Sequence, residues 1–125
     1  MVGMKSGMQE PADESFERFF AELVADYRRG LPEKFAELDA LWKSCDADKP
    51  ATGTLERLKH ELHALVGTAQ TMSLVCVTEA ARRAECFLDP FVSAGCIAQS
   101  ADRARFTQLL GTLQRSAELR QESQR

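Results

Sequence analysis

The 125 residues suffice for one domain, and 44% hydrophobic with 28% charged residues is typical of a globular protein. The formal net charge of −3 argues against generic attraction to nucleic acid or to an anionic membrane surface. The four cysteines form no CxxC pair, no signal peptide is visible and no apolar run is long enough to span a membrane. We therefore expect a cytoplasmic protein with reduced cysteines.

The first half of the chain predicts a leader and two helices. Residues 1–12 show no periodicity, which predicts a flexible leader. In residues 13–30 apolar side chains recur at spacings of three and four, and Gly30 after two arginines predicts the end of this helix. Pro32 suits the first turn of a second helix, whose apolar stripe runs to Cys45 before a loop begins.

The second half predicts three more helices, and the third helix of the chain has the most regular stripe. Its apolar residues alternate at spacings of three and four, as packing inside a bundle requires: Leu55, Leu58, Leu62, Leu65, Ala69, Met72 and Cys76. Further stripes follow over 77–91 and 100–117, and residues 121–125 predict a frayed tail. Residues 13–120 thus predict an all-α fold, an antiparallel up-down four-helix bundle with an additional N-terminal helix.

Both histidines, His60 and His63, lie on the third predicted helix. At 100° per residue His63 lies roughly 130° from the centre of the stripe, and His60 lies nearly opposite it, so both are expected at the surface. Gly67, four residues after His63, is unfavourable in a helix by about 0.8–1.0 kcal/mol relative to alanine. Because helical side chains lean toward the N-terminus, a glycine there leaves the His63 ring uncovered.

These residues carry a family resemblance. The run from His63 to Ala69, His-Ala-Leu-Val-Gly-Thr-Ala, resembles the His-x-Leu-Lys-Gly-Ser-Ala signature of histidine-containing phosphotransfer (HPt) domains. Ser73 stands where that family commonly has glycine, and Glu85 stands at its usual Glu or Gln position on the next helix. The resemblance covers roughly residues 55–88, and the helical layout of the remaining chain agrees with it.

The resemblance implies a phosphorelay intermediate. It implies that His63 accepts a phosphoryl group, through Nε2, from an aspartate of a receiver domain and passes it to another. The partners would be receiver domains of response regulators and of hybrid histidine kinases, and these would supply the Mg²⁺, so that this chain binds no cofactor and is not itself an enzyme. The chain has no P-loop and no glycine-rich nucleotide fingerprint. We expect it to act as a monomer.

One position departs from the signature, because Val66 replaces the family's lysine. A phosphoryl group on His63 needs a nearby cation. Lys59 lies one turn from His63 and is expected to support the site, although its side chain should lean away from the ring. If the third and fourth helices form a hairpin that turns near Leu74, Glu85 lies level with His63. Arg82 lies level with Val66 in that hairpin, so Arg82 or its neighbour Arg83 is a hypothetical source of the charge.

Partner docking is expected on the surface around the histidine, at His60, Val66 and Gln70. Three other interpretations stay open. The protein could have the HPt shape and bind signalling partners as an adaptor without being phosphorylated. His60, His63 and Glu61 could form part of a metal site, although HELH lacks the spacing of the HExxH motif and we expect no metal. The chain could also be a helical dimerisation module.

Overall fold

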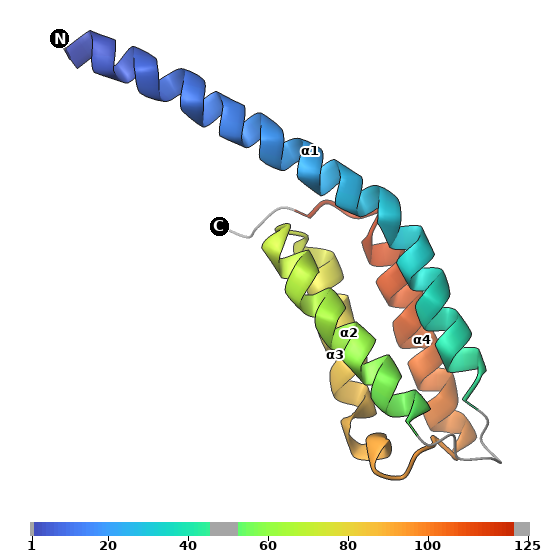
Figure 1. Ribbon diagram of the computed structural model, residues 1–125. Coiled ribbons are helices and arrows are strands. Elements are labelled where there is room, and N and C mark those ends of the chain that lie inside the picture. Colours follow the sequence, from blue (N-terminus) through green and yellow to red (C-terminus); the bar gives the residue numbers. More distant parts are fainter. Residues whose placement is uncertain (1, 46–52, 122–125) are drawn as a thin grey trace. The chain divides into compact units, whose positions relative to one another are not determined.

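The computed structural model describes residues 2–45 and 53–121, with side chains from Glu14 onward (Figure 1). Most of the predicted loop, residues 46–52, and most of the predicted tail, residues 122–125, lie outside the described residues. The described chain has no strand and forms four helices: α1 (Val2–Lys43), α2 (Thr54–Thr71), α3 (Val75–Val92) and α4 (Ser100–Ser116). It divides into two compact units, Met1–Gly30 and Leu31–Arg125.

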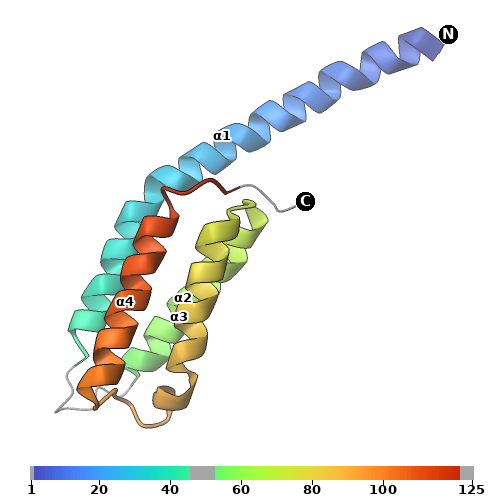
Figure 2. The ribbon, with the colours of Figure 1, turned by 180° about the vertical axis from the view of Figure 1, so that it is seen from behind.

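The second unit is a bundle of α2, α3, α4 and the C-terminal part of α1. The α3 helix packs against both α2 and α4. The α1 helix reaches α4 through a hydrogen bond from Trp42 Nε1 to Thr107 Oγ1 (3.0 Å), and it reaches α2 through the ion pair of Lys34 with Glu61 (2.9 Å). Successive helices run in opposite directions (Figures 1 and 2). The predicted all-α four-helix bundle is confirmed.

The core of the bundle consists largely of apolar residues from the predicted stripes, but Met72 and Cys76 are only half-buried and Cys76 lies on α3. Full burial of one such side chain stabilises a fold by about 1.5–3 kcal/mol. The ring of Phe106 meets Trp42 edge to face, with 4.8 Å between ring centroids. The other largest buried side chains come from all four helices and from the segment before α4: Leu31, Leu38, Leu55, Leu58, Leu62, Leu65, Val77, Leu88, Ile97 and Leu113.

The predicted helix break at Gly30 is wrong, because α1 continues through Gly30 and Pro32 to Lys43. The additional N-terminal helix and the first helix of the bundle are therefore parts of one helix. An interior glycine costs about 1 kcal/mol and an interior proline about 3 kcal/mol relative to alanine. The burial of Leu31 and Phe35 beside them offsets these costs. Gly30 nevertheless marks the boundary between the two compact units.

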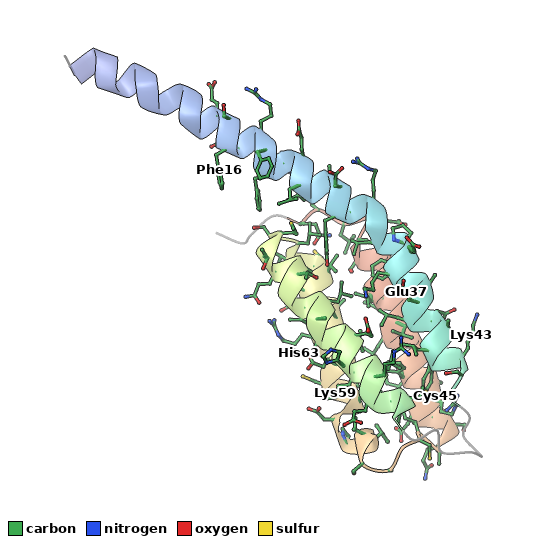
Figure 3. The ribbon with its side chains drawn as sticks, viewed as in Figure 1. Phe16, Glu37, Lys43, Cys45, Lys59 and His63 are labelled. Atoms are coloured by element: carbon green, nitrogen blue, oxygen red, sulfur yellow. The ribbon has the colours of Figure 1, made fainter. Side chains whose placement is uncertain are left out.

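The first unit is the N-terminal part of α1, which begins at Val2 and so includes residues of the predicted leader. Among its described side chains, the apolar stripe lies largely at the surface: Phe16 is 66% exposed, Phe19 61% and Leu23 40% (Figure 3). The rings of Phe16 and Phe20 stack along the helix. The spacing thus predicted the helix correctly but not the exposure of its apolar residues.

Gln121 belongs to the predicted frayed tail, but both the oxygen and the nitrogen of its side-chain amide form hydrogen bonds. Its Oε1 accepts hydrogen bonds from the backbone N–H groups of Cys76 (2.8 Å) and Val77 (3.3 Å), in the first turn of α3. Its Nε2 donates to the carbonyl oxygens of Ser116 (2.5 Å) and Leu119 (2.9 Å). The prediction of fraying is therefore wrong at this residue.

The turn between α2 and α3 is a Schellman motif centred on Ser73. The N–H of Leu74 donates to the Ala69 carbonyl (2.9 Å), and the N–H of Ser73 donates to the Gln70 carbonyl (3.0 Å). Ser73 has a φ of 61°, in the left-handed region that favours glycine. This turn determines which residues of α3 lie level with which residues of α2.

Ser73→Gly is therefore expected to stabilise the protein. The left-handed conformation costs a residue with a Cβ about 1–2 kcal/mol, and glycine loses part of this gain through its greater freedom in the unfolded chain. We expect a net rise of about 0.5–1 kcal/mol in the free energy of unfolding, measured by urea denaturation. Ser73→Ala keeps the Cβ and should give no rise. A glycine variant less stable than wild type would contradict the assignment of this turn.

Candidate functional site

The α2 helix presents His63 to solvent. Leu58, Leu62 and Leu65 are buried, so the other face of α2 is turned away from the core. The side chain of His63 lies on that outer face and is 73% exposed (Figure 3). The exposure predicted from the helical phase is confirmed, and another protein can reach this imidazole without any opening of the bundle.

A carboxylate on α3 fixes one nitrogen of the ring. Nδ1 of His63 lies 2.8 Å from Oε2 of Glu85, whose side chain is only 15% exposed. The same carboxylate oxygen lies 3.7 Å from Nζ of Lys59, and a carboxylate oxygen only accepts hydrogen bonds. In the neutral form of the ring this contact puts the hydrogen on Nδ1 and leaves the lone pair on Nε2. The hairpin register that predicts Glu85 level with His63 is confirmed.

Gly67 leaves open space beside the ring. A Cβ built on Gly67 meets no atom within 4 Å, and the residue is exposed. Close packing of another helix therefore does not explain the glycine, which costs the helix about 0.8–1.0 kcal/mol relative to alanine. This geometry agrees with the prediction that the glycine leaves His63 uncovered.

Lys59 lies in the same network as His63. Its Nζ is 3.3 Å from Oδ1 of Asp89 and 3.7 Å from Oε2 of Glu85, the same oxygen that binds the His63 ring. The hydrogen bond that Lys59 donates to the Asp89 carboxylate is the main cause that raises the pKa of Lys59 above its usual value. The expectation that Lys59 leans away from the site is wrong, because two carboxylates on the neighbouring helix attract its ammonium.

Asp89 is the site residue that the sequence analysis missed. It lies one turn after Glu85 on the same face of α3, so the hairpin register that places Glu85 beside His63 also places Asp89 beside Lys59. The signal was thus present in the sequence.

A cleft adjoins His63 between α2 and the last turns of α3. Three of its lining residues are acidic, namely Glu56, Glu85 and Asp89, and Lys59 is the one lysine or arginine among the described residues that line it. The remaining lining residues are two histidines and small or apolar residues: His60, His63, Gly53, Val92, Ser93, Ala94 and Gly95.

Arg82 and Arg83, the arginines proposed to supply a cation, do not line the cleft beside His63. Arg83 pairs with Glu79, one turn before it on α3, at 3.7 Å. Arg82 lines a separate depression near the α2–α3 turn, together with Gln70. No contact in the described part of the chain joins either arginine to His63, so the structure gives the charge hypothesis for them no support.

The predicted docking residues have different environments. His60 is exposed and lines the cleft beside His63. Gln70 is exposed near the end of α2. Val66 is only 8% exposed and packs into the bundle, so the expectation that it enlarges the docking surface is wrong.

The described residues contain no group of three or more histidines, cysteines or acidic residues that could hold a metal ion. Glu61, the acidic residue between the two histidines, pairs with Lys34 on α1 at 2.9 Å. In the same described ranges, none of the helices combines the length and the apolar character that crossing a bilayer requires.

Comparisons with protein-family models, with curated proteins and with solved structures found no match to this chain.

Proposed function

We propose that the protein is a phosphorelay intermediate that accepts and donates a phosphoryl group on Nε2 of His63. The observation that supports this proposal best is the environment of the His63 ring. The ring is 73% exposed, its Nδ1 is held by Glu85 at 2.8 Å, and the position four residues later is an open glycine. Together these features leave one nucleophilic nitrogen accessible to a partner protein.

The chemistry follows from the tautomer. The Nε2 lone pair attacks the phosphorus of an aspartyl phosphate, so that the N–P bond forms while the bond to the aspartate oxygen breaks. The electron pair of the broken bond stays on the aspartate carboxylate. The ring keeps its Nδ1 hydrogen and becomes positively charged, and the Glu85 carboxylate at 2.8 Å stabilises that charge. Transfer to another aspartate is the reverse of these steps.

The partner would complete the reaction. Phosphoryl transfer depends mainly on positioning and on neutralisation of charge. In this proposal a receiver domain of a response regulator or of a hybrid histidine kinase supplies the phosphorylated aspartate and the Mg²⁺. The chain supplies a nucleophile on a rigid helix, binds no cofactor of its own and is not a complete enzyme. It would act in the cytoplasm as a monomer.

The test of this proposal is transfer of radiolabel from phosphorylated receiver domains to the full chain. We expect label on the chain that is lost in acid and retained in base, as a phosphorus–nitrogen bond requires and an acyl phosphate does not. If no receiver from the source organism transfers label, the phosphorelay assignment is wrong.

An adaptor that binds receivers without being phosphorylated is the second candidate. The acidic lining of the cleft favours it, because Glu56, Glu85 and Asp89 oppose the arrival of another anion. Binding of an unphosphorylated receiver in the absence of any label transfer would support this function over the first.

A further inference from the structure

The charges around His63 are unfavourable for a second anion. Three carboxylates line the cleft, and Lys59 is the one lysine or arginine among its described lining residues. A phosphoryl group would bring about 1.5 to 2 further negative charges at neutral pH. Without a cation in contact with it, this group would be repelled by Glu85 and Asp89, and phosphorylation of His63 would be disfavoured.

Lys59 is positioned to supply that cation. It precedes His63 by one turn on the same face of α2 (Figure 3). Because helical side chains lean toward the N-terminus, the His63 ring lies over the turn that holds Lys59. The ammonium and the ring contact the same oxygen, Oε2 of Glu85, at 3.7 Å and 2.8 Å. The lysine side chain is 33% exposed, and its long stem allows the ammonium to move.

We propose that Lys59 contacts the phosphoryl group on His63 and stabilises it, an inference that rests on the proposed function. Before transfer, Asp89 and Glu85 hold the ammonium beside the ring. When the phosphoryl group is attached to Nε2, the ammonium exchanges Asp89 for the phosphoryl oxygens, which carry more charge than one carboxylate. Asp89, whose side chain is 60% exposed, is then solvated by water.

A purely structural role is the competing explanation, since Lys59 also links α2 to α3. Lys34 provides a matched control for that role. Its side chain is 34% exposed, against 33% for Lys59, and it links α1 to α2 through Glu61 at 2.9 Å. Lys34 does not line the cleft beside His63. Loss of either lysine therefore removes a similar ion pair between helices, but only Lys59 stands beside the acceptor ring.

The experiment measures the equilibrium of label between a phosphorylated receiver domain and the full chain, together with the hydrolysis rate of the labelled chain. We expect Lys59→Gln to shift the equilibrium about tenfold toward the receiver and to shorten the lifetime of the label. Lys59→Arg retains the charge and should remain within about twofold of wild type. Lys34→Gln should leave both quantities unchanged.

The outcomes separate this inference from the function on which it rests. Wild-type protein that takes label, with an unchanged equilibrium in Lys59→Gln, overturns the role of Lys59 and leaves the phosphorelay function intact. An equal loss in Lys34→Gln also overturns it, because the effect would then come from the removal of any ion pair between helices. The absence of label on the wild-type chain overturns both proposals.

Discussion

His63→Gln is expected to take no label from a phosphorylated receiver under conditions that label the wild-type protein. A glutamine amide has no nucleophilic lone pair on nitrogen, so no N–P bond can form at this position. The side chain is 73% exposed, and the change should alter the free energy of unfolding by no more than about 0.5 kcal/mol. The measurement is label incorporation over time, with urea denaturation to show that the variant is folded.

His60→Gln is the matched control for this variant. His60 lies one turn before His63, is exposed, and lines the same cleft. Within the described contacts His60 makes no hydrogen bond to Glu85, so its ring lacks the carboxylate that holds Nδ1 of His63. Loss of a docking contact should slow the labelling of His60→Gln, but this variant should still take label because its His63 ring is intact. Equal labelling of the His63 variant and the wild type would place the acceptor elsewhere and refute the assignment.

Substitution of Gly67 is expected to stabilise the helix while it blocks transfer. A Cβ at this position meets open space, so Gly67→Ala should raise the free energy of unfolding by about 0.8–1.0 kcal/mol. A leucine side chain would extend toward the N-terminus and cover the His63 ring. Because a misplacement of about 1 Å can cost a hundredfold in rate, we expect Gly67→Leu to lower the transfer rate by about that factor or more.

Gly30→Ala is the control that separates the gain in helix stability from the covering of the His63 ring. Gly30 also lies inside a helix, and a Cβ built there also meets nothing within 4 Å. It should therefore bring a similar gain in stability with no change in transfer. The interpretation of Gly67 as clearance for the ring fails if Gly67→Leu transfers label as fast as wild type. Urea denaturation and the initial rate of labelling provide the two measurements.

The parts of the site that could be predicted are those that helical phase and hairpin register determine. The phase of the Leu58, Leu62 and Leu65 stripe predicts that His63 lies outside, and one short turn predicts that Glu85 lies level with it. Both follow from the regular period of the helical backbone, which the spacing of apolar residues in the sequence reveals directly. The exposed histidine and its carboxylate partner could therefore be predicted from the sequence.

The wrong predictions concern features that depend on packing between helices or on the conformation of a long side chain. At Gly30 and Pro32 local preferences favour a helix end, but the burial of Leu31 and Phe35 favours continuation. The direction of Lys59 depends on Asp89, which lies 30 positions later in the chain and attracts the ammonium across the helix pair. Propensity describes only the near neighbours of a residue, so it could not reveal the continuation of α1, and only the hairpin register places Asp89 beside Lys59.

The hydrogen bonds of Gln121 have a consequence for the chain beyond α4. The first N–H groups of a helix have no acceptor within that helix, and the amide oxygen of Gln121 serves two of them in α3. The start of α3 therefore depends on a residue that follows the last helix of the bundle. Cleavage or fusion just before Gln121 would loosen the adjoining α2–α3 connection, and with it the alignment of Glu85 against the histidine ring. A domain boundary drawn at the end of α4 would remove part of the support on which the site depends.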